Sequence, residues 1–234
     1  MAQMIKLDPQ KSLPIIPIRK GSKGLPNKNI TPLAGKPLYL YTVEQALRLF
    51  GQCVISTDIA SVLEADLPDN CLILKRPDQL SQDTTLMDDV LLHVLDELSK
   101  IDITPELCLL LQATSPLRLD EDVKKAVAFY KANNFDLVKS VSPVDPGFLK
   151  FGSIGPDGEF IPVSKPQYCF SNRQDLPQMV RPNGAVYVFS AKTLIANNGL
   201  ACQSIGAVQT EHSIDIDTHK DLLRAEMIIR EQSS

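Results

Sequence analysis

Short apolar runs alternate with segments of helical periodicity over the first 140 residues of the chain. The runs predict buried strands at Leu13–Ile18, Cys53–Ser56, Cys71–Leu74, Leu107–Leu111 and Leu137–Val141. Apolar residues at helical spacing predict helices at Pro37–Phe50, Ile59–Ala65, Met87–Leu98 and Glu121–Asn133. Regular alternation of strand and helix is typical of an α/β fold, in which a mostly parallel sheet carries helices on both faces.

The alternation stops at residues 142–181, a stretch that contains six prolines. Its short apolar pieces, such as Phe160–Val163, predict hairpins. We interpret this stretch as a β-rich insertion that projects from a single domain spanning residues 1–234. Such an insertion serves either as a dimerisation element or as a mobile lid. After it, the α/β pattern resumes with elements predicted at Gly184–Phe189, Ala191–Ala196, Ile205–Val208 and Thr218–Arg230.

A basic, glycine-rich loop follows the first predicted strand. Between Ile18 and Asn29 the chain carries four cations and two glycines: Arg19, Lys20, Gly21, Lys23, Gly24 and Lys28. Glycines allow backbone N–H groups to approach phosphate oxygens closely, and the cations offset phosphate charge, so the loop suits a polyphosphate. The spacing matches neither the Walker A motif nor the dinucleotide-binding fingerprint. On composition alone, a solvated basic turn is an equal alternative.

Polar residues follow each of the next predicted strands as well. They are Ser56, Thr57 and Asp58, then Arg76 with Leu80–Asp83, then Gln112 with Thr114–Arg118. In parallel α/β sheets, ligands bind beyond the carboxyl ends of the strands. Together with the basic loop after the first strand, these three sets of polar residues predict a cleft at the carboxyl edge of the sheet.

Two aspartates near the end of the chain alternate with isoleucines in Ser213–Thr218. In an extended strand, Asp215 and Asp217 point one way while Ile214 and Ile216 point the other. Mg²⁺ binds one or two carboxylates and completes its coordination with water and phosphate oxygens. A helix cap formed by Asp217 or Thr218 is the alternative, but it does not account for the alternation. We therefore expect a magnesium site, with Thr218 capping the last helix.

Composition narrows the class of protein. The 234 residues are 44% hydrophobic and 22% charged, with a net charge of −4, which argues against extensive nucleic-acid binding. The N-terminus shows no signal-peptide pattern and no apolar stretch reaches membrane-spanning length, so we expect a cytoplasmic protein. The spacing of the five cysteines and three histidines does not suit a zinc site. We expect Cys53, Cys71 and Cys108 to be reduced core residues.

Six motifs occur in an order that resembles one enzyme family. They are RKGSKGLPNKN, RP followed by LSQDT, LLQATSPLR, RPNGAVY, LIANN and SIDIDT. Together they resemble the bacterial CMP-N-acylneuraminate synthetases, which are cytidylyltransferases, from about Ile15 to Ala225. The resemblance implies a Rossmann-like nucleotidyltransferase fold and a homodimer. It also implies a reaction in which CTP and a nine-carbon 2-keto sugar acid give a CMP-sugar and pyrophosphate.

The resemblance also implies roles for individual residues. The implied triphosphate ligands are Arg19, Lys23, Lys28 and Asn29, and Arg76 is implied to lie near the base or the phosphates. The implied catalytic residues are Arg19, Lys28, Asp215 and Asp217, with the two aspartates binding Mg²⁺. The implied sugar-binding residues are Gln112, Asn183 and Tyr187, joined by Lys150 and Arg173 from the partner subunit.

The chain departs from the family pattern at four positions: Ile18, Leu86, Met87 and Ala113. These positions bear on the shape of the nucleotide pocket, and relatives that activate legionaminic or pseudaminic acid, with CTP or GTP, are alternatives. The SNRQDLP stretch resembles the legionaminic branch as much as the sialic one. Three further alternatives are a glycosyltransferase that uses Asp215 and Asp217 as its DxD motif, a Kdo cytidylyltransferase, and a non-catalytic nucleotide-sugar-binding module.

Overall fold

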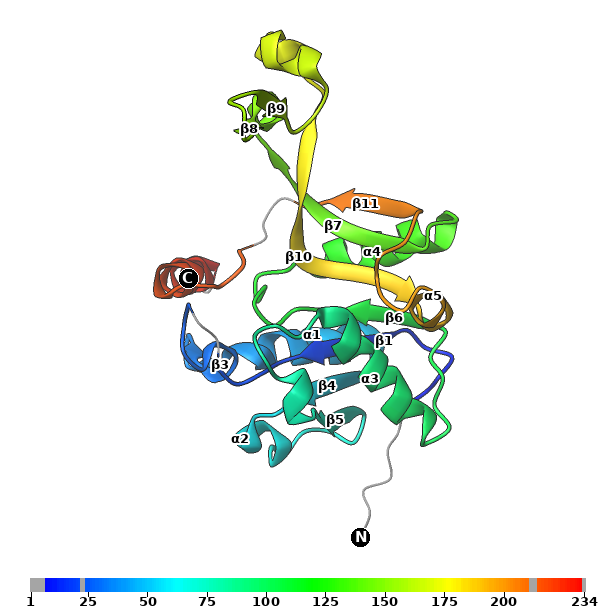
Figure 1. The fold of residues 1–234 in the computed structure, drawn as a ribbon. Helices are drawn as coiled ribbons and strands as arrows, with labels where there is room; N and C mark the ends of the chain where they lie inside the picture. The colour runs from blue at the N-terminus through cyan, green and yellow to red at the C-terminus, as the bar shows by residue number, and fades with distance from the viewer. Residues whose placement is uncertain (1–6, 22–23, 211–213, 233–234) are drawn as a thin grey trace.

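The computed structural model describes residues 7–21, 24–210 and 214–232. Its main sheet has seven strands in the order β11-β7-β10-β6-β1-β4-β5 (Figure 1). The strands are β1 (Leu13–Pro17), β4 (Cys53–Thr57), β5 (Cys71–Lys75), β6 (Leu107–Leu110), β7 (Leu137–Val144), β10 (Met179–Ser190) and β11 (Ile205–Gln209). All neighbours pair in parallel except β10, which runs antiparallel to both β6 and β7.

Helices cover both faces of this sheet, as the alternating pattern predicts. The helices are α1 (Leu38–Phe50), α2 (Ala60–Leu63), α3 (Met87–Ser99), α4 (Asp120–Ala132), α5 (Ala191–Ala196) and α6 (His219–Gln232). Side chains alternate along each strand, so Ile16 packs with α1, α2 and α4 on one face while Ile15 packs with α3 and α5 on the other. The predicted α/β class with a mostly parallel sheet is confirmed. Cys53, Cys71 and Cys108 are buried free thiols, as expected.

The last helix lies away from the sheet. Leu222 and Ala225 of α6 pack with Ile216, with Leu38 of α1, and with Leu33 of a small hairpin made of β2 (Pro32–Leu33) and β3 (Lys36–Pro37). This third hydrophobic cluster fixes the C-terminal segment beside the loop that follows β1. No helix in the described part of the chain is both long enough and apolar enough to span a membrane.

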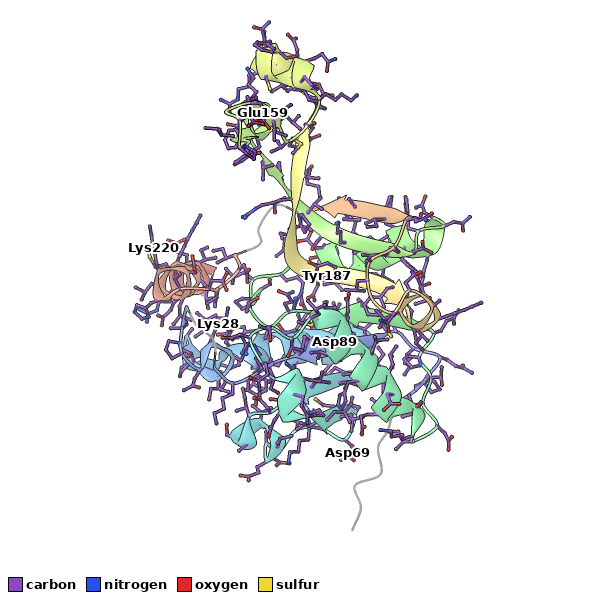
Figure 2. The ribbon with its side chains drawn as sticks, viewed as in Figure 1. Lys28, Asp69, Asp89, Glu159, Tyr187 and Lys220 are labelled. Carbon is purple, nitrogen blue, oxygen red and sulfur yellow. The ribbon has the colours of Figure 1, made fainter. Side chains whose placement is uncertain are left out.

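Residues 142–181 project from the sheet as an arm (Figure 1). The base of the arm is formed by two strands of the main sheet, because β7 continues to Val144 and β10 begins at Met179. Between them lie a short hairpin, β8 (Gly152–Ile154) with β9 (Phe160–Pro162), and three 3₁₀ turns. Glu159, labelled in Figure 2, marks the position of this hairpin in the arm.

Strand β10 carries a bulge where it re-enters the sheet. Its register against β7 shifts between Pro182 and Tyr187, and Gly184 inside the bulge has a φ of 77°. Bulges re-aim side chains near functional sites, and here the bulge brings Asn183 and Gly184 to the edge where the parallel strands end.

The loop that follows β6 is held by the buried side chain of Arg118. Its guanidinium donates to the carbonyls of Gln112 and Ala185 at 3.2 and 2.9 Å, to Gln45 Oε1 at 2.9 Å and to Thr42 Oγ1 at 3.1 Å. Burial lowers the pKa of Arg118 to about 9, so the group remains protonated at neutral pH. Arg118 therefore ties together α1, β10 and the end of β6.

Candidate active site

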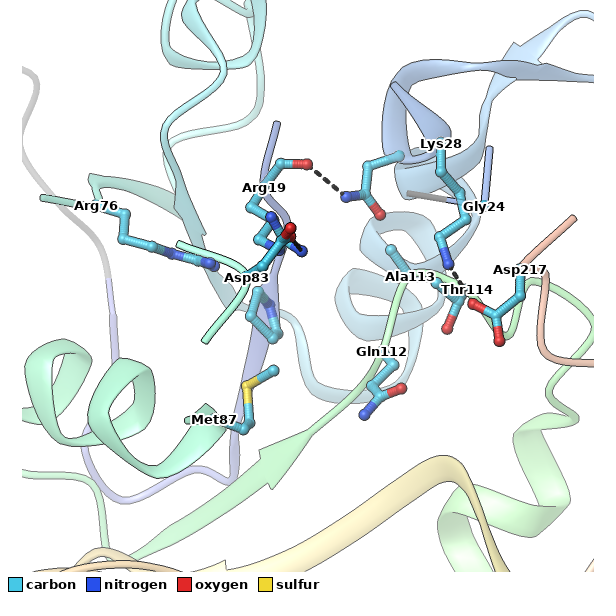
Figure 3. A pocket seen from close by; sticks show the side chains of 12 residues that line it. Arg19, Gly24, Lys28, Arg76, Asp83, Met87, Gln112, Ala113, Thr114 and Asp217 are labelled. Atoms are coloured by element: carbon cyan, nitrogen blue, oxygen red, sulfur yellow. Dashed lines mark hydrogen bonds and ion pairs between the residues drawn. The ribbon is translucent and has the colours of Figure 1, made fainter. Parts of the chain in front are cut away.

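A cavity of about 390 Å³ lies at the carboxyl ends of the parallel strands (Figure 3). We call it the first cavity. The residues that line it come from the loops after β1, β5 and β6 and from the C-terminal segment: Pro17, Arg19, Gly24, Lys28, Asn29, Arg76, Asp83, Met87, Gln112, Ala113, Thr114 and Asp217. The structure thus brings Arg19, Lys28, Asn29, Arg76, Gln112 and Asp217 together. Lys23 lies outside the described residues.

The basic loop is braced within this cavity. Arg19 pairs with Asp83 at 2.5 Å between Nη2 and Oδ1. The buried Asn29 donates from Nδ2 to the carbonyl of Arg19 at 2.9 Å (Figure 3). Asn29 therefore fixes the backbone from which the Arg19 side chain extends, a positioning role that the sequence did not reveal.

The loop meets the aspartate segment at Asp217. Lys28 Nζ lies 2.6 Å from Asp217 Oδ1, across 189 positions of sequence (Figure 3). Gly24 lies so close to the backbone of Asp217 that a Cβ at position 24 would collide with the Asp217 carbonyl oxygen. Glycine is therefore required here for close packing, and the contact brings the cations of the loop beside the predicted metal ligands.

The prediction of a strand at 213–218 is wrong for the described residues 214–217, which form no strand. Ile216 is fully buried in the third cluster, and its N–H donates to the Thr114 carbonyl at 2.8 Å. Burial still alternates along this segment: Ile216 is buried, and Asp215 and Asp217 on either side of it are exposed. One anchored isoleucine is enough to produce this pattern. Thr218 caps α6 by accepting from the N–H of Asp221, whose carboxylate accepts from Thr218 in return.

The surroundings of Asp215 disfavour its charged form. Although solvent reaches the carboxyl, it sits in a concave site, and desolvation raises its pKa. The neighbouring Asp217 adds to the increase, while Lys28 opposes it. A divalent cation between the two carboxylates would relieve this repulsion. In the described part of the chain no group of three or more His, Cys, Asp and Glu side chains could hold a metal, but two carboxylates fit Mg²⁺, which takes its remaining ligands from phosphate and water.

Arg76 is almost fully buried at the end of the first cavity. It donates from Nη2 to the carbonyl of Ser56 at 2.7 Å and from Nε to Ser56 Oγ at 3.1 Å. Desolvation lowers its pKa to about 10, so the guanidinium stays protonated at neutral pH. Ser56 and Thr57 themselves are buried residues of β4, so of the three polar residues predicted after this strand only Asp58 follows it.

A second cavity of about 530 Å³ adjoins the first and shares Asp217 with it. Its lining comes from β10, α6 and the segment between them: Arg181, Pro182, Asn183, Gly184, Tyr187, Ile214, Asp215, Asp217, Asp221 and Arg224. Tyr187 is half-buried, and its pKa is raised by burial and by the nearby Asp215.

The amide of Asn183 is engaged by the protein. Its Oδ1 lies 2.6 Å from Ser140 Oγ, and its Nδ2 donates to Ser142 Oγ at 3.0 Å and to Thr210 Oγ1 at 2.7 Å. Asn183 therefore ties the bulge to β7 and to the end of β11, besides lining the second cavity.

The two predicted sugar-binding residues of the arm, Lys150 and Arg173, are not brought to either cavity of the same chain. Arg173 pairs instead with Asp145 within the arm, at 3.0 Å.

Comparison with known proteins finds a matching family and several relatives that are named as cytidylyltransferases. The Cytidylyltransferase family model matches residues 13–150. The chain is 32% identical to the N-acylneuraminate cytidylyltransferase of Streptococcus agalactiae serotype V, over 91% of this chain and 52% of that protein. It is 31% identical to the CMP-N,N'-diacetyllegionaminic acid synthase of Legionella pneumophila, over 93% of this chain and 95% of that protein. The chain thus spans about half the length of the streptococcal relatives and nearly all of the Legionella one.

A more distant relative and a solved structure complete the comparison. The chain is 27% identical to the pseudaminic acid cytidylyltransferase of Campylobacter jejuni, over 94% of this chain and 97% of that protein. Its fold is similar to that of CMP:2-keto-3-deoxy-manno-octonic acid synthetase complexed with CTP, with a TM-score of 0.73 and 16% identity over 95% of this chain and 100% of that one.

Gly184 offers a test of the geometry at the bulge. A Cβ there would lie 3.0 Å from Gln112 Oε1, whereas Gly51, with a similar φ of 72°, has open space around it. Both Gly184→Ala and Gly51→Ala should lower the free energy of unfolding by about 1 to 2 kcal/mol, because both place a Cβ in left-handed backbone.

Only Gly184→Ala should also displace Gln112. We expect it to lower the catalytic efficiency of CTP-dependent pyrophosphate release by about tenfold or more, with Gly51→Ala near wild type. Chemical denaturation and steady-state kinetics measure the two effects. Equal activity of both variants would show that Gln112 has no role that depends on its position.

Proposed function

The chain belongs to the CMP-N-acylneuraminate cytidylyltransferase family, and on this premise we propose that it activates a nine-carbon 2-keto sugar acid. In this reaction the anomeric hydroxyl oxygen of the acid bonds to the α-phosphorus of CTP, and the bond from that phosphorus to the bridging oxygen breaks. Pyrophosphate leaves with the bonding electrons, and the hydroxyl proton passes to a carboxylate or to water. The products are the CMP-sugar and pyrophosphate.

The contact between Lys28 and Asp217 carries the proposal. It lies where the first and second cavities meet, so a phosphate chain in one and a hydroxyl in the other converge on the same point. Holding two reactants in line can lower the barrier greatly without any further chemistry. We assign the first cavity to CTP and the second to the sugar acid.

The cations of the first cavity stabilise the triphosphate and the charge that develops on the leaving group. Lys28 and Arg19 are each paired with a carboxylate, Asp217 and Asp83, and would exchange these partners for phosphate oxygens. Arg76 is held by Ser56 and adds fixed positive charge beside them. Mg²⁺ bound by Asp215 and Asp217 would offset further charge on the transferring phosphoryl group.

Family membership favours this reaction over the other enzyme class. A DxD glycosyltransferase shares the aspartate pair, but the matched family is cytidylyltransferases and the pair adjoins a phosphate-binding loop. The sugar acid is open between sialic, legionaminic and pseudaminic types, because relatives of all three types are about equally distant, between 27% and 34% identical. We place the reaction in the cytoplasm, where CTP is made and where the buried free thiols remain reduced.

A panel of substrates tests the proposed function. With the folded protein and Mg²⁺, we expect CTP consumption and pyrophosphate release when N-acetylneuraminic, legionaminic or pseudaminic acid is added, and loss of both when the metal is chelated. GTP serves as the alternative nucleotide in a parallel series. Absence of turnover with every acid and both nucleotides would leave a non-catalytic binding module as the remaining interpretation.

The arm supports a homodimer as part of the same proposal. Its large apolar side chains are exposed, up to 81% at Ile154 and 91% at Phe170, and they include Phe148, Phe151, Phe160, Ile161 and Val163. Exposed apolar surface of this kind marks a protein interface. A two-fold dimer would bury it and could carry Lys150 and Arg173 to the partner's second cavity.

Complementation between two inactive variants tests the crossover. Asp217→Asn and Arg173→Ala should each be nearly inactive alone. After subunit exchange about half of the dimers are mixed, and each mixed dimer has one intact site of two, so about a quarter of wild-type activity should return.

Asp145→Asn is the matched control, because it breaks the same ion pair while leaving Arg173 charged. It should remain active if Arg173 acts on the substrate rather than on the arm. If verified mixed dimers show no recovery of activity, Arg173 does not complete the site of the other subunit.

A further inference from the structure

Two arginines line the second cavity, and the sequence motifs assign a role to neither of them. Arg181 precedes the bulge of β10, and Arg224 lies in the second turn of α6. Figure 2 places Tyr187 on β10 and Lys220 on α6, the two elements that supply the walls of this cavity. The arginines therefore approach the same space from separate elements.

Local geometry directs both side chains to the cavity. Arg181 pairs with Ser142 just before the register of β10 shifts, and it lines the cavity together with Asn183 from the bulge. Arg224 follows Asp221 by three positions on α6, so these two share a helix face, and both line the cavity. Leu222 and Ala225 lie on the adjacent stripe of the helix, which packs into the third cluster.

Two of the three aspartates that line the second cavity already have partners. Asp221 accepts from Thr218 as part of the helix cap, and Asp217 pairs with Lys28. Within residues 7–21, 24–210 and 214–232, neither Arg181 nor Arg224 is paired with a carboxylate. Two exposed guanidinium groups thus face a cavity in which Asp217 and Asp221 are held by other partners, while Asp215 is the third aspartate of the lining.

We propose, on the basis of the function proposed above, that Arg181 and Arg224 are positioning residues. They would hold the carboxylate of a sugar acid bound in the second cavity of the same subunit. In the ring form of a 2-keto sugar acid, the carboxylate is attached to the same anomeric carbon as the attacking hydroxyl. When that hydroxyl reaches the junction at Asp217, the carboxylate lies within the second cavity, beside Asp215.

Without cations nearby, the repulsion between this carboxylate and the aspartates would oppose binding. Guanidinium groups bind carboxylates through two parallel hydrogen bonds, which fix orientation as well as charge. The arginine pair would therefore set the direction from which the hydroxyl attacks. Arg173 of the partner subunit would then contact a different part of the sugar.

Neutral variants test this assignment. Arg224→Gln and Arg181→Gln should each raise the KM for the sugar acid by about 10- to 100-fold, the effect of losing a charge-assisted hydrogen bond. The KM for CTP should stay within about twofold, since the first cavity is unchanged. Arg230→Gln is the matched control, because Arg230 lies on the same helix and lines neither cavity. Arg224→Lys should recover part of the affinity by restoring the charge without the planar fork.

The methyl ester of the acid, which lacks the negative charge, separates this role from a structural one. Its binding, measured by calorimetry in the presence of Mg²⁺ and a non-hydrolysable CTP analogue, should be equally weak with wild type and with Arg224→Gln. Arg173→Ala should weaken acid and ester alike.

Unchanged KM for the acid in both neutral variants, alongside normal wild-type turnover, would overturn this inference and leave the proposed function intact. If Arg173→Ala weakened binding of the acid but not of its methyl ester, the carboxylate would be assigned to the partner's Arg173 instead. Wild-type protein that turns over no such acid would overturn the proposed function and this inference with it.

Discussion

The buried guanidinium of Arg118 is the constraint on which both cavities depend. Burying an arginine is tolerated only when its donors are satisfied, and here they reach Gln45, Thr42 and the carbonyls of Gln112 and Ala185. One group thereby fixes the end of β6 relative to the bulge of β10 and to α1. Because Gln112 lines the first cavity and the bulge lines the second, the relative position of the two cavities follows from this network.

The second constraint is the close approach of two segments that are distant in sequence. Gly24 packs against the backbone of Asp217, and Lys28 neutralises its carboxylate. Ile216 in the third cluster holds the aspartate segment in place from behind. The cations that we propose to bind phosphate and the carboxylates that we propose to bind Mg²⁺ are thus assembled before any ligand arrives, which is the preorganisation that phosphoryl transfer requires.

Hydrophobic periodicity predicts most of this fold, because a buried strand or an amphipathic helix shows its burial in its own sequence. It places every strand of the main sheet and the edge at which the polar loops gather. It does not reveal that Arg118 is structural while Arg19 faces the first cavity, since both follow strands in basic, polar loops. Nor does it identify Arg181 and Arg224, whose cavity exists only once β10 and α6 are brought together. The prediction of a strand at residues 213–218 was wrong for the described residues, because one anchored isoleucine produces alternating burial without a neighbouring strand to pair with.

We propose that Asp217 serves the chemistry at the junction of the two cavities rather than the stability of α6. The most direct measurement is a comparison of kcat and melting temperature for Asp217→Asn, because the carboxylate is 67% exposed and its pairing with Lys28 should add little stability. Our account predicts a fall in kcat on the order of a hundredfold or more with an unchanged melting temperature. A lowered melting temperature with near-normal turnover would contradict this and would leave Asp217 with a structural role at the start of α6.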